Sequence, residues 1–289
     1  MSADRRQTAL VTGTSTGIGA ATAVRLARDG MSVVGSIRRA GSADELLAVA
    51  AEESLDLSMV EMDVDDDAAV ARGVAEAIDR VGPIDVLVNN AGFGTSRVVE
   101  DATLDEFRAH METNFFGALR TIKAVLPAMR SRRAGTVVNV SSQAGRWAIP
   151  ALTPYVASKY ALEGMTEALA FQVARFGVRV ALVEPGAIIT ATLGKSSPWP
   201  DDSAYGHVYD AFTSLVIDDF AEGSPASLVA DCISHAISTD EPLLRYEVGS
   251  GAARNIAGRA RLSDEAWIGI GAHVDDDDLI AEFRAALGR

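Results

Sequence analysis

Several common features are scarce or missing in this chain of 289 residues. It has one cysteine, Cys232, which excludes an intrachain disulfide and a zinc site built on several cysteines. It has 26 basic against 40 acidic residues, a formal net charge of −14, which argues against nucleic acid or an anionic membrane surface as a partner. No apolar run reaches the roughly 18 residues of a membrane span, and the N-terminus has no apolar signal core. We therefore expect a cytoplasmic protein with no membrane span.

Acidic residues are abundant, but their spacing does not predict a metal site. The run from residue 275 to 278 consists of four consecutive aspartates, whereas a calcium loop spaces its ligands along the chain. The simplest interpretation is a helix start, where negative charge is favourable to the helix dipole. We predict no metal.

Apolar segments of strand length alternate with segments of helical periodicity along most of the chain. Strands are expected at residues 7–12, 31–37, 57–62, 84–88, 136–140, 178–183 and 244–248. Helices are expected between them, with the longest over residues 104–130 and 154–176 and another over 224–238. Short apolar strands separated by helices predict an α/β fold, a Rossmann-type doubly wound parallel sheet of about seven strands with helices on both faces. Ligands of such sheets bind beyond the carboxyl ends of the strands.

A glycine-rich segment directly follows the first strand and precedes a helix. Gly13 permits a tight turn, Gly17 lets backbone N–H groups approach a pyrophosphate, and Gly19 allows close packing of the helix on the strand. The helix N-terminus adds positive potential for phosphates. The segment predicts a phosphate-binding turn, although a purely structural turn would have the same sequence.

Tyr155 and Lys159 are four residues apart, so on a helix they share one face. A phenol has a pKa of about 10, and a neighbouring ammonium is expected to lower it. Such a pair can exchange a proton near neutrality. Ser142 lies 13 residues before Tyr155 and could hold a substrate oxygen beside the phenol. A surface tyrosine and a solvated lysine on an amphipathic helix would be the alternative.

Taken in order, these segments resemble the short-chain dehydrogenase/reductase family, in its single-domain branch of roughly 250 residues. The resemblance is close over about residues 6–190. It rests on Thr12-Gly13-x-x-x-Gly17-Ile18-Gly19, Asp63-Val64, Asn89-Asn90-Ala91-Gly92, Asn114, Ser142, Tyr155-x-x-x-Lys159 and Pro185-Gly186-x-x-x-Thr190.

The resemblance implies a nicotinamide-dependent oxidoreductase and a role for each motif. Tyr155 would donate the proton in reduction and accept it in oxidation. Lys159 would lower the pKa of Tyr155 and bind the nicotinamide ribose. Ser142 would polarise the carbonyl, and Asn114 would hold a water of the proton relay. Ser141 competes with Ser142 for the serine role. The cofactor would contact Gly13, Ser15, Thr16, Gly17, Ile18, Gly19, Arg38, Asp63, Val64, Asn90, Ala91, Gly92, Tyr155, Lys159, Pro185, Gly186, Ile188 and Thr190.

The end of the second strand bears on the choice of cofactor. An NAD site of this kind places a carboxylate there for the ribose 2′-hydroxyl, whereas an NADP site uses an arginine for the 2′-phosphate. Here the acidic position is Ile37, and Arg38 follows it. We predict NADP(H), with NAD(H) as the alternative, because many NADP-dependent relatives carry a basic residue where this chain has Thr16.

The substrate is predicted from the segments that flank the site. Residues 187–223 resemble the mobile substrate lid of the family, and the surroundings of Tyr155 are similar to hydroxysteroid and retinol dehydrogenases. We expect a small-molecule hydrophobic ketone or aldehyde, or its alcohol, with a steroid-like or long-chain skeleton. His207 and His235 are not expected to be catalytic. Candidate pocket residues are Phe93, Trp147, Ile149, Leu193 and Trp199.

Residues 1–249 are expected to form the Rossmann-fold domain, and residues 250–289 a C-terminal extension packed on it. Helices are expected over 254–260 and 275–287, with Gly-Ile-Gly-Ala between them. The family resemblance implies a homodimer or homotetramer. Three other functions compete: an NAD-dependent alcohol dehydrogenase of the same family, a non-catalytic NADP-binding regulator, and an epimerase or dehydratase, which would need a larger substrate domain.

Overall fold

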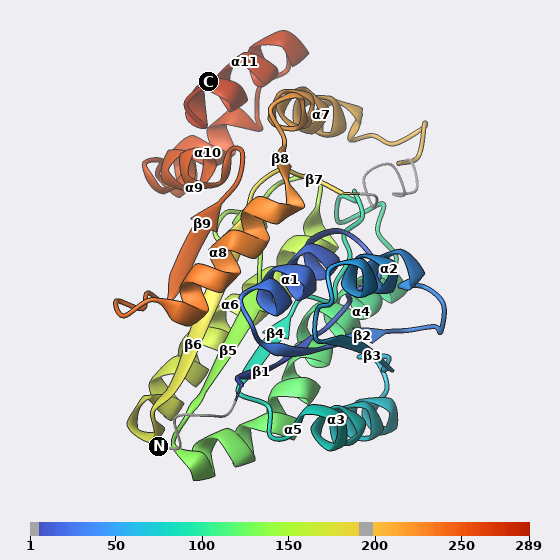
Figure 1. The fold of residues 1–289 in the computed structure, drawn as a ribbon. Helices are drawn as coiled ribbons and strands as arrows, with labels where there is room; N and C mark the ends of the chain where they lie inside the picture. The colour runs from blue at the N-terminus through green and yellow to red at the C-terminus, as the bar shows by residue number, and fades with distance from the viewer. Residues whose placement is uncertain (1–5, 191–198) are drawn as a thin grey trace.

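A parallel sheet of seven strands forms the centre of the molecule (Figure 1). The computed structural model describes residues 6–190 and 199–289. The strands lie in the order β3-β2-β1-β4-β5-β6-β9, and each neighbouring pair is parallel. This confirms the predicted doubly wound sheet. The strands are β1 (Thr8–Val11), β2 (Ser32–Ile37), β3 (Leu57–Glu61), β4 (Val86–Asn89), β5 (Gly135–Val140), β6 (Val178–Pro185) and β9 (Arg245–Val248).

Helices cover both faces of this sheet, which explains why its strands are apolar throughout rather than alternating. Leu10 of β1 is paired with Val34 of β2 and Leu87 of β4, and all three are fully buried. One face is covered by α1 (Gly17–Arg28), α2 (Asp44–Glu52) and α8 (Ala226–Ser238), and the other by α3 (Asp67–Val81), α5 (Gly117–Arg132) and α6 (Thr153–Val173).

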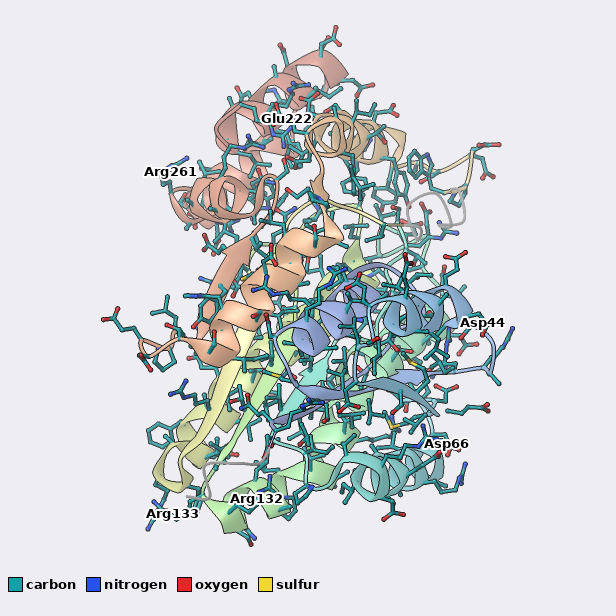
Figure 2. All side chains as sticks on the ribbon, viewed as in Figure 1. Asp44, Asp66, Arg132, Arg133, Glu222 and Arg261 are labelled. Atoms are coloured by element: carbon teal, nitrogen blue, oxygen red, sulfur yellow. The ribbon has the colours of Figure 1, made fainter. Side chains whose placement is uncertain are left out.

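The helix predicted over residues 104–130 is interrupted. It consists of α4 (Leu104–Met111), a π turn at Glu112–Phe116, and α5. The start of α4 is fixed by a capping box in which Thr103 and Glu106 each satisfy a backbone N–H of the other. Figure 2 shows Asp66 at the start of α3 and Arg132 at the end of α5, each with the charge that favours that helix end.

A second group of helices lies beyond the carboxyl ends of the strands (Figure 1). We call α7, α9, α10 and α11 the helical cap. The prediction missed α10, and Ser224–Pro225 form a short strand rather than the start of a helix. Among the described residues, no helix is long and apolar enough to cross a membrane. The elements here are β7 (Ile188–Ile189), α7 (Gly206–Ala221), β8 (Ser224–Pro225), α9 (Ala252–Ala260), α10 (Asp264–Ile270) and α11 (Asp276–Ala286).

Candidate active site

Ser142 and Tyr155 meet at the carboxyl end of β5. Ser142 is two residues beyond that strand, and its Oγ accepts a hydrogen bond from Ala144 N at 3.1 Å. Tyr155 lies in the first turn of α6, which begins at Thr153 with Pro154 next to it. Burial raises the pKa of the Tyr155 phenol, while its hydrogen bond with Ser142 acts in the opposite direction. The Ser142 hydroxyl and the Tyr155 phenol therefore lie next to each other.

Lys159 is one turn further along α6 and is buried. Its Nζ donates a hydrogen bond to Val140 O at 2.9 Å and lies 5.6 Å from the centre of the Tyr155 ring. Burial lowers the pKa of Lys159 to about 8, and the negative charge of Glu163 acts against that shift. The sequence-based expectation of a lowered phenol pKa is not met, because desolvation of Tyr155 is the larger effect.

Asn114 is placed by the π turn between α4 and α5. It is 2 % exposed, and its Nδ2 donates to Phe93 O and to Ser158 Oγ, both at 2.9 Å. Its Oδ1 accepts from Phe93 N at 3.0 Å. Ser158 in turn donates to Tyr155 O at 2.7 Å, so a short chain of polar contacts joins Asn114 to the helix of the tyrosine. Single π turns inside helices are frequent at functional sites.

The glycine-rich turn is packed so closely that larger residues cannot replace two of its glycines. A Cβ on Gly13, whose φ is +70°, would lie 2.8 Å from Ala91 Cα. A Cβ on Gly19 would lie 2.2 Å from Gly13 O. Asn90 braces this turn, because its Nδ2 donates to Thr12 O at 2.9 Å and to Gly13 O at 3.1 Å. The start of α1 is thereby tied to the end of β4.

The remaining candidate cofactor residues line the same edge of the sheet. Ser15 and Thr16 are exposed at the start of α1, and Gly17 lies beside Thr190, whose Cγ2 would be 3.3 Å from a Cβ added there. Gly186 donates to Val248 O at 2.8 Å and lies against the backbone of Ser250. Ile18 and Asp63 are half-buried, and buried side chains occur at Val64, Pro185 and Ile188.

Arg38 is exposed directly after β2, and the preceding Ile37 is buried. The Arg38 guanidinium has no side-chain hydrogen bond among residues 6–190 and 199–289. Burial raises the pKa of Asp65, and the charge of Arg38 is among the effects that lower it. The guanidinium is thus available to a ligand at the end of the second strand.

The candidate substrate residues lie in three different surroundings. The Phe93 ring, in the loop that follows β4, is 4.3 Å from the ring of His110 in α4. Trp147 is 1 % exposed, and its ring contacts those of Trp267 and Phe283 in the helical cap. Trp199 is stacked on Tyr209 with 4.7 Å between ring centres. Ile149 is buried with Trp147, and Leu193 lies outside the described residues.

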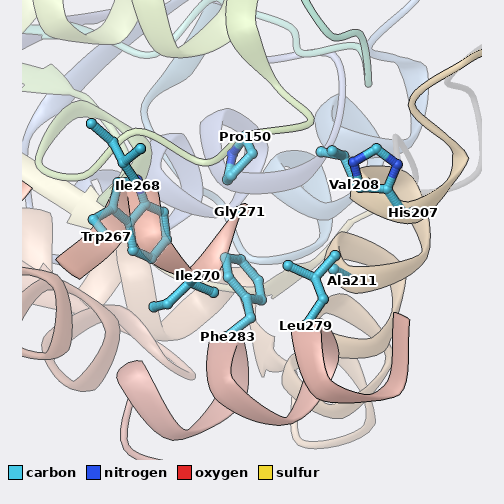
Figure 3. Close-up of a pocket in the computed structure, with 10 residues that line it drawn as sticks. All are labelled: Pro150, His207, Val208, Ala211, Trp267, Ile268, Ile270, Gly271, Leu279 and Phe283. Atoms are coloured by element: carbon cyan, nitrogen blue, oxygen red, sulfur yellow. The ribbon is translucent and has the colours of Figure 1, made fainter. Parts of the chain in front are cut away.

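An apolar cavity of about 190 Å³ lies between α7, α10 and α11 (Figure 3). Pro150, from the loop after β5, forms another part of its wall. Neither Ser142 nor Tyr155 lines this cavity, but Tyr155 packs against a cluster of buried residues that contains part of its lining. The residues of the lining are Pro150, His207, Val208, Ala211, Trp267, Ile268, Ile270, Gly271, Leu279 and Phe283.

Sequence reasoning missed a group of polar contacts between the serine loop and the cap. Asn255 of α9 donates to Gln143 Oε1 at 2.9 Å and to Asp219 Oδ2 at 3.2 Å. Asp219 of α7 also accepts from Arg254 at 2.9 Å. It also missed Ser158 beside Asn114, Glu163 near Lys159, and Glu184, which pairs with Arg146 and Arg245. The available signal was the polar residues inside the otherwise apolar segments 156–173 and 178–185.

Comparison with known proteins gives the class of this protein. The family model for short chain dehydrogenase matches residues 7–201, and the chain belongs to this family. It is therefore an oxidoreductase that acts on small molecules.

Three similar proteins illustrate the range of the family. Human retinol dehydrogenase 8 is 42% identical over 254 residues, which cover 83% of this chain and 81% of the relative. A short-chain dehydrogenase structure from Streptomyces avermitilis superposes with a TM-score of 0.81 at 33% identity, covering 94% of this chain and 100% of that one. An actinorhodin polyketide ketoreductase crystallised with NADPH has a TM-score of 0.75 at 29% identity, covering 86% and 97%.

Proposed function

We propose that this protein is an NADP(H)-dependent oxidoreductase that interconverts a hydrophobic ketone or aldehyde and its alcohol. The observation that carries the proposal is the convergence of Ser142, Tyr155, Lys159 and Asn114 at the carboxyl end of the sheet, next to a glycine-rich turn. These residues come from the loop after β5, from α6 and from the π turn, and they lie at the edge where ligands of doubly wound sheets bind.

The residues at this edge fit a nicotinamide dinucleotide. Gly13 and Gly19 leave no room for a side chain, and α1 presents its free N–H groups where a pyrophosphate would lie. When bound, the cofactor supplies or accepts the hydride. Ser15, Thr16, Gly17 and Ile18 would hold the phosphates, Asp63 and Val64 the adenine, and Asn90, Ala91, Gly92, Pro185, Gly186, Ile188 and Thr190 the nicotinamide half.

The protein itself supplies a proton donor that is held in position. The raised pKa of Tyr155 keeps the phenol protonated, which is the form required of a proton donor in reduction. Ser142 would hold the substrate oxygen beside this phenol. Lys159 would stabilise the phenolate as it forms and bind the cofactor ribose, while Asn114 fixes the turn of α6 through Ser158.

Arg38 supports a preference for the phosphorylated cofactor. A guanidinium binds a phosphate dianion more tightly than it binds a neutral hydroxyl, and no carboxylate occupies the position before it. The similarity to a ketoreductase crystallised with NADPH supports the same choice. NAD(H) is the alternative that direct titration with both cofactors would distinguish.

The apolar cavity supports a substrate with an extended hydrocarbon part. A carbonyl bound at Tyr155 is adjacent to the cluster that includes Ala211, Leu279 and Phe283, which also line the cavity. The similarity to a retinol dehydrogenase agrees with a long or steroid-like apolar skeleton. The other residues proposed to contact the substrate are Phe93, Trp147, Ile149, Leu193 and Trp199, which do not line this cavity among the described residues.

A face of the molecule supports a homodimer or homotetramer. Phe171 of α6 is 89 % exposed, and Tyr160 of the same helix and Phe116 of the π turn are also exposed. Tyr160 and Phe171 are 11 positions apart, about three helical turns, so they lie on one side of α6. Exposed large aromatic side chains of this kind are typical of an interface between subunits.

The test of the reaction is the variant Tyr155→Phe. It should bind NADPH with the affinity of the wild type and reduce hydrophobic ketones about a hundredfold to ten-thousandfold more slowly, since only the proton donor is removed. Single-turnover assays with a series of ketones would measure the rate, and NADPH fluorescence would measure binding. A variant with the rate of the wild type would contradict the mechanism.

A further inference from the structure

Two carboxylates are buried where α6, which carries Tyr155 and Lys159, meets β6 and β9. Glu163 of α6 is 4 % exposed and Glu184 of β6 is fully buried. Arg245 of β9 lies between them, with its Nε 3.2 Å from Glu163 Oε2 and 3.3 Å from Glu184 Oε1. Arg146 approaches Glu184 from the loop after β5, with its Nη1 3.1 Å from each carboxylate oxygen. We call these four residues the Glu163 network.

Stability alone does not account for this network. Buried ion pairs contribute little net stability, because removing the charges from water costs about as much as their attraction returns. The network also reaches the serine loop: Ser141 faces Glu163, and Glu163 Oε1 and Ser141 Oγ, both buried, have no hydrogen-bond partner outside this pair in the described part of the chain. A charged group retained in such surroundings suggests a role in the chemistry nearby.

Glu163 is placed where it can act on Lys159. The two residues are four apart on α6, so they are neighbours on one face of the helix. Lys159 Nζ is held by Val140 O, and the next residue, Ser141, faces Glu163. Both side chains crowd Gly145, where an added Cβ would lie 2.8 Å from Glu163 Cγ and from Ser141 Oγ. The carboxylate therefore sits close behind the loop that carries Ser142.

We infer that Glu163 is a positioning residue for the reaction: its carboxylate, held by Arg245, keeps the buried Lys159 ammonium charged. The inference rests on the proposed function, in which a charged Lys159 holds the ribose and stabilises the Tyr155 phenolate. Without a nearby negative charge, a buried ammonium would release its proton at lower pH.

The titration of the network depends on every charged group around it. On α6 these are Tyr155, Lys159 and Tyr160, with Glu167 bonded to Arg245 at 2.6 Å. From the other elements they are Glu184 on β6, Arg245 on β9, Arg146 after β5 and Arg259 on α9, whose charge acts on Tyr160.

Burial raises the pKa of both carboxyls, so their charge depends on the groups around them. Burial, with the charge of Glu163 as the next cause, raises the pKa of Glu184 to about 7. Ser141 and Arg245 both lower the pKa of Glu163 against the effect of burial. Glu163 therefore has two partners that favour its ionised form, and it is the carboxylate that lies one turn from Lys159 on α6.

The composition of the chain makes this inference directly measurable. It has three lysines, Lys123, Lys159 and Lys195, so protein labelled with ¹³C at the lysine ε-carbon gives three signals. Replacing Lys123 and Lys195 by arginine assigns the third signal to Lys159. Following that signal against pH gives the pH midpoint at which the Lys159 ammonium loses its proton. In Glu163→Gln the midpoint should fall by about one pH unit.

Glu167→Gln is the matched control. Glu167 is one turn further along α6 and binds the same Arg245, but its side chain is 63 % exposed. It should leave the Lys159 midpoint within about 0.2 units of the wild type, because an exposed charge is screened by solvent. An unchanged midpoint in Glu163→Gln, or an equal change in both variants, would overturn the inference.

Cofactor binding provides the second measurement. In Glu163→Gln, NADPH affinity should fall as the pH rises, and the pH midpoint of that fall should shift in the same direction as the midpoint of the Lys159 signal. Glu163→Asp should reverse part of this shift. If NADPH does not bind to the wild type at any pH, the proposed function fails, while the lysine titration still decides the inference about Glu163.

Discussion

Arg38 is the residue on which the proposed preference for NADP(H) depends. In Arg38→Ala, the KM for NADPH should rise about tenfold to a hundredfold, the loss expected for a charge-assisted hydrogen bond, whereas the KM for NADH should stay within about twofold. Steady-state kinetics with both cofactors would measure the two values. Arg39→Ala is the control, since Arg39 is the equally exposed neighbour. Equal changes for the two cofactors in Arg38→Ala would place the 2′-phosphate elsewhere.

Glu184 makes the stability of the protein depend on pH. Its pKa is raised from 4.5 to about 7 by burial, so the protonated carboxyl stabilises the fold fully below about pH 4.5 and this contribution is lost as the pH rises through about 7. Glu184→Gln should therefore match the wild type near pH 5 and be more stable at pH 8, by roughly 1 to 3 kcal/mol.

Urea denaturation at both pH values would give the free energy of unfolding of each protein. Glu247→Gln is the control, because Glu247 is paired in register with Glu184 on the neighbouring strand but is exposed. A constant difference between Glu184→Gln and the wild type across this range would contradict the prediction.

Single residues could be predicted from sequence only where a local spacing identifies them. Tyr155 and Lys159 are one helical turn apart, and the structure brings them together with Ser142 as expected. Glu163 and Glu184 are 21 positions apart and meet through Arg245, a further 61 positions along the chain. No local pattern connects these three residues, and only the pairing of β6 with β9 places Arg245 beside both carboxylates.

At the scale of elements, the strands were predictable because burial on both faces leaves a continuous apolar run. The π turn at Glu112–Phe116 was not predictable, because the segment 104–130 has helical periodicity throughout. The extra residue of this turn is accommodated by the contacts of Asn114 with Phe93 and Ser158. The short helix α10 was missed although Ser263 caps it by accepting from Ala266 N. Its seven residues are too few for a periodic pattern.

The cavity between α7, α10 and α11 predicts how kcat/KM depends on the chain length of the substrate. In the wild type, kcat/KM should rise roughly fourfold for each methylene added to a straight-chain ketone, at about 0.8 kcal/mol per buried group. Ala211→Phe, which places a ring in the cavity of about 190 Å³, should abolish that rise and leave the shortest ketones unaffected.

Asp210→Phe is the matched control, because Asp210 is the exposed neighbour of Ala211 on α7. Chain-length series for the three proteins would provide the comparison. A rise with chain length that persists in Ala211→Phe would show that the apolar part of the substrate binds outside this cavity.

At the scale of the whole molecule, the proposed extension of residues 250–289 is joined to the sheet domain by buried contacts. Trp267 of α10 packs edge-on against Trp147 at 6.0 Å, and Asn255 of α9 links Gln143 with Asp219. The sequence showed the helices at residues 254–260 and 275–287, but their position required the partners on α7 and in the loop after β5. We propose that this segment unfolds together with the sheet domain.

The exposed aromatic face on α6 leads to a prediction about assembly. Phe171 is 89 % exposed, and burying such a side chain at an interface contributes about 1.5 to 3 kcal/mol per subunit. Phe171→Glu places a charge there instead and should convert the proposed dimer or tetramer into smaller species. Light scattering coupled to size-exclusion chromatography would measure the mass of each protein. Val274→Glu, at a residue 98 % exposed before α11, should leave the mass unchanged. A wild-type mass near 30.3 kDa, or an unchanged mass in Phe171→Glu, would show that this face of α6 does not hold subunits together.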